Sequence, residues 1–364
     1  MKIIHCADLH LDSKMDTHLS KEQARERKAE ILNTFNRMVS YAAENGVSAI
    51  IIAGDLFDRK TVSRTAKNTV YNAVKSNPDI EFFYLKGNHD TENALLTCGE
   101  RPQNLKLFNG GWTAYSVGER VTVTGAELDK NTPPAVYKTL SLDADKINIV
   151  TLHGAQSEYA SKSDAEIIPL GELKNKNIDY LALGHIHAPK IERLDSRGMY
   201  GYSGCLEGRG FDECGARGFI LLDADEAMGK VSIRFVPFAA RELVDIRVDV
   251  TDLENTADIS DAAQRAVAAA NTAPENIVKI TLTGEVGVEC EKNTELIKKR
   301  FEPCFYFVRV KDETKLKIDY SRFKSDRSLK GEFVRCVMAG DMTEDEKAAV
   351  IRCGIQALMG EEIE

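Results

Sequence analysis

"VSAIIIAGDLFDR", residues 47–59, passes from a continuous apolar run into a turn that carries two carboxylates and an arginine. Strands of a parallel sheet that is buried on both faces read as continuous apolar runs. Open α/β sheets bind their ligands at the carboxyl ends of such strands. Asp55 is therefore expected where a ligand would bind, although Asp and Gly are also ordinary turn residues.

Apolar runs and amphipathic stretches alternate through the first half of the chain. Helices are expected over residues 20–46, where Ser20 and Gln23 form a capping box, and over about 61–76. Further strands are expected at residues 2–7, 80–86, 146–152 and 178–184. This alternation predicts an α/β fold with parallel strands.

The pattern becomes β-rich at about 112–124 and again at 199–237, which predicts a second sheet packed on the first. About 80 residues after Arg241 read as a small α+β module, and the tail reads as two amphipathic helices. The expected architecture is α/β: a two-sheet sandwich flanked by helices, followed by the α+β module and a C-terminal helical segment. The expected domains are residues 1–238, 239–318 and 319–364.

Composition describes an ordinary soluble protein, with 43% hydrophobic and 29% charged residues among 364. The N-terminus lacks the apolar region of a signal peptide, and no run approaches transmembrane length, so a cytoplasmic location is expected. The eight cysteines include no C-x-x-C pair, which argues against a zinc ribbon or a disulfide framework. The net charge of −9 disfavours self-sufficient nucleic-acid binding, but it leaves room for a local basic groove or a basic partner.

Side chains that ligate metals follow five of the expected strands, and five of the seven histidines lie at these positions. Asp, Asn and His together suit divalent ions with mixed nitrogen and oxygen preference, such as manganese, iron or zinc. The candidate ligands are Asp8, His10, Asp55, Asn88, His153, His185 and His187.

Seven candidates exceed what one ion needs, so two ions that share Asp55 as a bridge are expected. Two-metal sites hold ions ~3.5–4 Å apart and clamp the attacking and leaving oxygens of a displacement at phosphorus. With only Asp8 and Asp55 as anionic ligands, two divalent ions would leave the site positive, which suits a phosphodiester. Each motif alone is more often a turn than a ligand, and it is their ordered combination that favours a site.

The order D-x-H, G-D-x-x-D, G-N-H-D, H and G-H-x-H, over residues 8–187, resembles the calcineurin-like metallophosphoesterases. The resemblance implies the two-sheet metallophosphoesterase sandwich and a catalytic His89 that protonates the leaving oxygen or stabilises charge at the phosphoryl group. It implies that Asp58 orients His89 or contacts substrate. Arg59 is the candidate substrate-binding residue, and for both Asp58 and Arg59 the alternative is that they only close the turn. The implied ligand sets are Asp8, His10, Asp55 and His187 for one ion, and Asp55, Asn88, His153 and His185 for the other.

A closer resemblance is to the DNA repair exonucleases of the SbcD type, carried by "IIHCADLHLDS", "DYLALGHIHAP" and "YSGCLEGRGFDECGARGFILLD". It implies a two-metal-dependent DNA nuclease of DNA break repair, an exonuclease on duplex ends, with single-strand endonuclease activity left open. The implied ions are two divalent metals, Mn(II) first, with Fe(II), Zn and Mg as alternatives. The protein-phosphatase branch usually reads G-N-H-E where this chain has "GNHD". The alternative function is a phosphoesterase of cyclic nucleotides or other small phosphoesters, and a scaffold with a decayed site is the third hypothesis.

In that family the α+β module caps the site and positions DNA, and the tail docks on an SbcC-type coiled-coil ABC ATPase. The chain has no G-x-x-x-x-G-K-[ST] loop, so ATP dependence would come from that partner. A homodimer is left open. The alternative for the tail is that its apolar side chains pack on their own domain; they are Leu329, Phe333, Val337, Val350, Ile351, Ile355 and Leu358.

Overall fold

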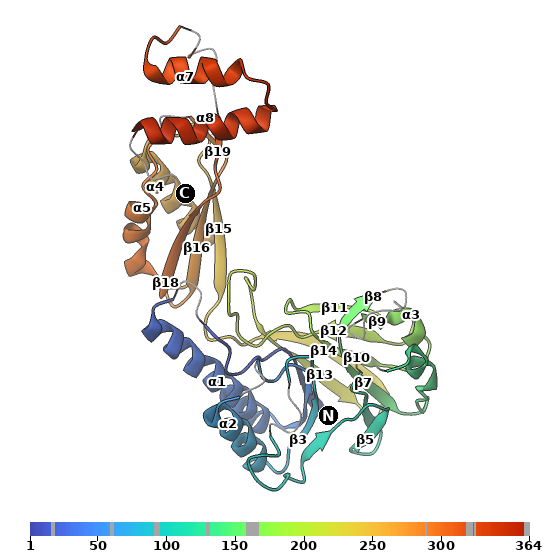
Figure 1. Ribbon diagram of the computed structural model, residues 1–364. Helices are drawn as coiled ribbons and strands as arrows, with labels where there is room; N and C mark the ends of the chain where they lie inside the picture. Colours follow the sequence, from blue (N-terminus) through green and yellow to red (C-terminus); the bar gives the residue numbers. More distant parts are fainter. Residues whose placement is uncertain are drawn as a thin grey trace. The chain divides into compact units, whose positions relative to one another are not determined.

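The structure, a computed structural model, describes residues 1–15, 19–58, 62–90, 95–128, 132–157, 167–287, 290–317, 323 and 325–359. Met1–Glu242 and Leu243–Glu364 form two separate units (Figure 1). The division falls at residues 242/243, and the expected domain boundaries at 238/239 and 318/319 stay predictions. The candidate substrate-binding residue Arg59 lies outside the described residues.

The first unit contains a six-stranded sheet in the order β14-β13-β1-β2-β3-β4. β1 to β4 run parallel, β13 is antiparallel to β1, and β14 is antiparallel to β13. The strands are β1 (Lys2–Cys6), β2 (Val47–Ala53), β3 (Glu81–Leu85), β4 (Leu105–Leu107), β13 (Gly218–Asp225) and β14 (Lys230–Pro237).

A second six-stranded sheet has the order β11-β12-β10-β7-β6-β5, with β6, β7, β10 and β12 parallel. Its strands are β5 (Thr113–Val117), β6 (Val121–Gly125), β7 (Ile147–His153), β10 (Tyr180–Gly184), β11 (Lys190–Arg193) and β12 (Met199–Tyr202). β8 (Ala155–Ser157) pairs with β9 (Ile167–Pro169) beside it. This confirms the predicted α/β class with two sheets.

Successive residues of the central strands point into different cores, which explains the continuous apolar run of β2. Ile50 and Ile52 pack in the cluster that also holds Phe35 of α1 (Lys21–Glu44) and Val70 of α2 (Arg64–Lys75). Ile51 packs instead in a cluster built from both sheets. Figure 1 shows α1 and α2 side by side along this unit. The far face of the second sheet is covered in part by η1 (Pro134–Thr139) and α3 (Leu170–Leu173).

The start of α1 follows the predicted capping box. The Ser20 side chain accepts from Gln23 N, and the Gln23 side chain accepts from Ser20 N. α1 ends at Glu44, and Gly46, which has a φ of 64°, follows its C-cap residue.

The second unit contains a parallel three-stranded sheet, β15-β16-β18, whose core includes residues of α4 and α5. A separate parallel pair is formed by β17, which follows β16, and β19, which follows β18. The bounds are β15 (Leu243–Asp249), α4 (Thr256–Ala270), β16 (Ile277–Thr283), β17 (Glu285–Gly287), α5 (Thr294–Phe301), η2 (Glu302–Cys304), β18 (Phe307–Asp312) and β19 (Lys315–Lys317).

The tail contains the two expected helices, α7 (Leu329–Met338) and α8 (Glu344–Met359). Val337, Ile351 and Ile355 pack in one buried cluster between them. Three other apolar side chains remain exposed: Leu329 (70%), Val350 (40%) and Leu358 (41%). Some apolar residues of the tail are therefore buried between α7 and α8, and others are exposed. Among the described residues, no helix is both long and apolar enough to cross a membrane.

A buried ion pair ties α1 to the segment after β12. The side chains of Arg27 and Glu207 are both fully buried, with Arg27 Nη2 3.2 Å from Glu207 Oε2. Arg27 also donates to the Gly208 carbonyl at 2.9 Å. Glu207 Oε1 accepts from the hydroxyl of Thr34 at 2.7 Å and from the backbone N–H of Ala240. The pair therefore fixes residues 207 and 208, which lead into the next loop, against α1.

We expect Arg27→Met to lower the free energy of unfolding of the first unit by about 3–5 kcal/mol, because Glu207 would stay buried without its charged partner. Urea unfolding followed by circular dichroism measures the change. Arg25→Met, at an exposed position of the same helix, is the matched control and should stay within about 0.5 kcal/mol of wild type. Equal losses in both variants would contradict the role given to the buried pair.

Candidate metal centre

The side chains predicted to ligate metals come together at one end of the two sheets. Asp8 and His10 follow β1, Asp55 follows β2, and His153 ends β7. Ligand atoms of Asp8, His10 and His187 lie within 4.8 Å of one another, and so do those of Asp8, Asp55 and His153. The two groups share Asp8.

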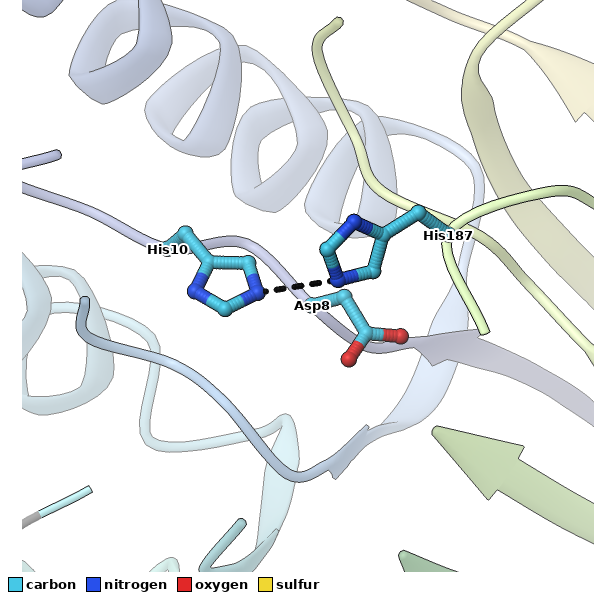
Figure 2. A group of neighbouring side chains, drawn as sticks. All are labelled: Asp8, His10 and His187. Carbon is cyan, nitrogen blue, oxygen red and sulfur yellow. Dashed lines mark hydrogen bonds between the residues drawn. The ribbon is translucent and has the colours of Figure 1, made fainter. Parts of the chain in front are cut away.

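The first group centres on two imidazoles that face each other (Figure 2). His10 Nε2 and His187 Nε2 are 3.2 Å apart. The other nitrogen of each ring is held by a carboxylate: His10 Nδ1 lies 3.1 Å from Asp58 Oδ1, and His187 Nδ1 lies 2.7 Å from Glu213 Oε1. The Glu213 contact is the largest cause of a raised pKa for His187.

This arrangement fits a cation. An ionised carboxylate only accepts hydrogen bonds, so each neutral ring keeps its proton on Nδ1 and turns a lone pair outward at Nε2. In the metal-free chain the Glu213 contact favours a proton on His187, and a proton on its Nε2 makes the 3.2 Å hydrogen bond to His10 Nε2. A metal ion that binds both rings would take the place of that proton. A metal-ligating histidine commonly donates its other N–H to a carboxylate in this way.

The second group centres on His153, whose Nδ1 lies 2.9 Å from the Ala53 carbonyl. Its Nε2 lies 2.7 Å from Asn88 Oδ1 and 3.4 Å from Asp55 Oδ2. Burial lowers the pKa of His153, but the hydrogen bond and charge of Asp55 outweigh this and raise it to about 9. The metal-free ring therefore holds protons on both nitrogens, and a divalent ion bound at Nε2 would replace one of them.

Asp55, a member of the second group, also approaches the first group. Its Oδ2 is 3.8 Å from His10 Nε2 as well as 3.4 Å from His153 Nε2, and its Oδ1 accepts from the backbone N–H of His89 at 2.9 Å. Burial raises the pKa of Asp55, but the contact with His153 outweighs it and lowers the pKa to about 2. This position is compatible with the expected bridge.

Asp8 and His185 are joined through the backbone. Both carboxylate oxygens of Asp8 accept from the backbone N–H of His185, at 2.9 and 3.0 Å. Burial raises the pKa of Asp8 to about 6. The His185 ring lies edge-on to His153, with the ring centroids 5.5 Å apart. Its role as a ligand stays a prediction.

The backbone turns sharply at these strand ends. Asp8, His10, Asp55 and His185 all have positive φ values, between 44° and 98°. This region is sparsely populated by residues other than glycine, and such strain gathers at functional sites.

Two of the motif glycines are needed for space. A Cβ on Gly184 would lie 1.9 Å from the Ala53 carbonyl oxygen, and one on Gly54 would lie 2.1 Å from His153 Nδ1. At Gly184 the ends of β2 and β10 approach each other too closely for any side chain.

His89 is exposed, and its ring lies edge-on to His10 at a centroid distance of 5.0 Å. Ligand atoms of His10, Asp58 and His89 fall within 4.8 Å of one another. Asp58 contacts His10 directly, so it supports a candidate ligand as well as lying near His89. The catalytic roles of His89 and Asp58 stay predictions.

Two residues that the sequence analysis gave no role complete the surroundings of the first group. Glu213 holds His187, and Arg209 lies 2.7 Å from Glu213 and 3.3 Å from Asp58. Both residues belong to the stretch 202–223, which carried part of the family resemblance. Only that resemblance could have identified Arg209 and Glu213 from the sequence, because no local spacing relates them to positions 10 and 58.

Comparisons with known proteins show the family of this chain. The family model described as calcineurin-like phosphoesterase matches residues 1–189. The DNA double-strand break repair protein Mre11 of Archaeoglobus fulgidus is 24% identical, over 96% of this chain and 84% of its own length. Mre11 of Methanopyrus kandleri is 27% identical, over 68% of this chain and 59% of its own.

A further relative is the uncharacterized metallophosphoesterase YhaO of Bacillus subtilis, which is 27% identical over 70% of this chain. The match spans 64% of that protein's length. The match thus covers less than two thirds of the length of two relatives, Mre11 of Methanopyrus kandleri and YhaO.

We expect the binding of a divalent ion to release about one proton per chain at pH 7, because the metal-free His153 is protonated below pH 9. The apparent affinity of the His153 site for Mn²⁺ should then rise about tenfold per pH unit between pH 7 and pH 8, since the ion bound there displaces one proton. Calorimetric titration in buffers of different ionisation enthalpy counts the protons. Binding without proton release at pH 7 would contradict the assignment of Nε2 as a ligand atom.

Proposed function

The chain belongs to the calcineurin-like phosphoesterase family, and from this we propose that it is a two-metal-dependent DNA nuclease of DNA break repair. The observation that carries the proposal is the pair of facing imidazole nitrogens, His10 Nε2 and His187 Nε2, with Asp55 beside them. DNA as the substrate is supported by the similarity to the Mre11 repair proteins, one of which is matched over nearly the whole of this chain.

The proposed activity is exonucleolytic on duplex ends, with endonucleolytic cleavage of single strands as a second activity. Manganese is the proposed ion, because the candidate ligands combine imidazole nitrogens with carboxylate and amide oxygens. We assign Asp8, His10, Asp55 and His187 to one ion, and Asp55, Asn88, His153 and His185 to the other.

Divalent ions bound there would polarise a phosphoryl oxygen and lower the pKa of a water molecule. The chain's own contribution is orientation. Asp58 and Glu213 fix the ring planes of His10 and His187, and the His89 N–H holds one oxygen of Asp55 in place. The exposed His89 ring lies beside His10, where a ring nitrogen can give a proton to the leaving oxygen of a bound ester.

We expect His89→Leu to lower the rate of cleavage of end-labelled duplex DNA about 10²–10⁴-fold while the manganese content stays at the wild-type level. The variant keeps the backbone N–H that Asp55 accepts, and it removes only an exposed side chain. Asp55→Ala is the comparison variant and should lose both cleavage and metal. The metal content of both is measured by elemental analysis after gel filtration.

Loss of metal from His89→Leu would contradict its assignment as a proton donor. A bis-aryl phosphate and a cyclic nucleotide are assayed alongside the DNA. If the wild-type chain hydrolyses these esters and leaves DNA intact, addition of the candidate ATPase decides between a required partner and the alternative function on small phosphoesters.

The proposed partner is a coiled-coil ABC-type ATPase of the SbcC type, bound through the helices of the tail. The exposed apolar side chains Leu329, Val350 and Leu358 support this proposal, because they remain uncovered after α7 and α8 have packed on each other. The residues buried between α7 and α8 are then needed for the hairpin itself.

We expect the combined change Leu329→Ser, Val350→Ser and Leu358→Ser to weaken ATPase binding by about 10²-fold or more, since each apolar side chain buried in an interface contributes about 1.5–3 kcal/mol. Binding is measured by biolayer interferometry with the purified ATPase. Hydrolysis of the bis-aryl phosphate should not change. Ala349→Ser with Ala357→Ser, at exposed positions of α8, is the control. Unchanged binding by the triple variant would refute this docking surface.

A further inference from the structure

Arg209 links the two carboxylates that hold the facing histidines. Its Nη1 lies 3.3 Å from Asp58 Oδ1, and its Nη2 lies 2.7 Å from Glu213 Oε1. Asp58 contacts His10, and Glu213 contacts His187. A single guanidinium therefore closes a chain of contacts that runs from one imidazole to the other on the side away from their facing Nε2 atoms.

The guanidinium makes more than a point contact with Glu213. Arg209 Nη2 and Nε lie 2.7 and 3.2 Å from Glu213 Oε1, and Nε lies 3.4 Å from Oε2. The Arg209 backbone N–H, which any substitution keeps, also donates to Oε2 at 2.7 Å. The planar fork of an arginine holds a carboxylate in one orientation, which the single ammonium of a lysine cannot do. With the carboxylate fixed, the ring plane of His187 is fixed as well.

The loop that carries Arg209 and Glu213 is itself anchored. The Cys205 N–H donates to the His187 carbonyl at 3.2 Å, and Arg217 Nε donates to the Glu213 carbonyl at 3.0 Å. Arg27 holds the Gly208 carbonyl at 2.9 Å. The loop is thus bound to the strand end that bears His187 and to α1, and Arg209 reaches from it to the opposite histidine.

We propose that Arg209 and Glu213 are positioning residues that set the separation and orientation of His10 and His187. The affinity of the ion site built on these two histidines depends on the guanidinium bridge, and the site built on Asn88 and His153 does not. The inference rests on the proposed function, since it requires two ions. The competing view is that the bridge only stabilises the loop.

Mn²⁺ titration of the metal-free chain, with free ion counted by electron paramagnetic resonance, separates these views. Wild type should bind two ions. Arg209→Met should weaken one site about 10–100-fold, the usual effect of losing a partner that orients a ligand, and leave the other unchanged. The spectrum of two coupled ions should disappear at ion concentrations that saturate wild type. Arg209→Lys should restore the affinity only in part.

Arg197→Met is the matched control, because Arg197 also pairs with a carboxylate, Asp179, at 2.9 Å but contacts no candidate ligand in the described part of the chain. It should bind two ions like wild type. Glu213→Gln is the second variant and keeps an acceptor for His187, so its weaker site should again be the His10–His187 site.

Each outcome decides the matter. Two ions bound with wild-type affinity by Arg209→Met would overturn the positioning role and leave the proposed function standing. Equal weakening of both sites, together with a fall in the melting temperature of the metal-free chain, would also overturn it in favour of a purely stabilising bridge. Failure of wild type to bind any ion would overturn the proposed function and this inference together.

Discussion

Two imidazole nitrogens that face each other across 3.2 Å, each with its ring held from behind by a carboxylate, are the constraint on which the rest of the site depends. Neighbouring lone pairs repel unless a proton or a metal ion lies between them, and in the metal-free chain a proton on one Nε2 makes the hydrogen bond. The buried carboxylates Asp8 and Asp55, at the same strand ends, would likewise repel each other in the absence of positive charge. The negative charge and the lone pairs of these groups therefore favour the binding of positive ions. An anionic ester becomes a suitable ligand only once such ions are bound.

The fold brings these groups together at a cost in backbone conformation. Four of the candidate ligands have positive φ values, and each such residue costs of the order of 1–3 kcal/mol. β1 and β2, which carry three of them, are buried on both faces, by the helices on one side of the first sheet and by the second sheet on the other. Such packing lets the strand ends be held in strained geometry. The approach of β10 to β2, which leaves no room for a side chain at Gly184, belongs to the same arrangement.

The sequence allowed the strands and the candidate ligands to be predicted, because both depend on local order. An apolar run followed by Asp, Asn or His marks a strand end, and parallel strands bring such ends to one edge. The capping box of Ser20 follows from the same kind of local pattern. Contacts between distant segments could not be predicted. The bridge from Asp58 through Arg209 to Glu213 joins segments about 150 residues apart, and no periodicity encodes it. The division of the tail into a buried and an exposed apolar set likewise depends on how α7 packs on α8.

The central claim is that two ions lie at the edge where the two sheets meet, on either side of Asp55. Anomalous scattering from crystals of the metal-free chain soaked in Mn²⁺, collected on both sides of the manganese edge, tests it most directly. The account predicts two anomalous peaks that share Asp55, one next to His10 and His187 and the other next to Asn88 and His153. A single peak, or peaks remote from Asp55, would contradict it.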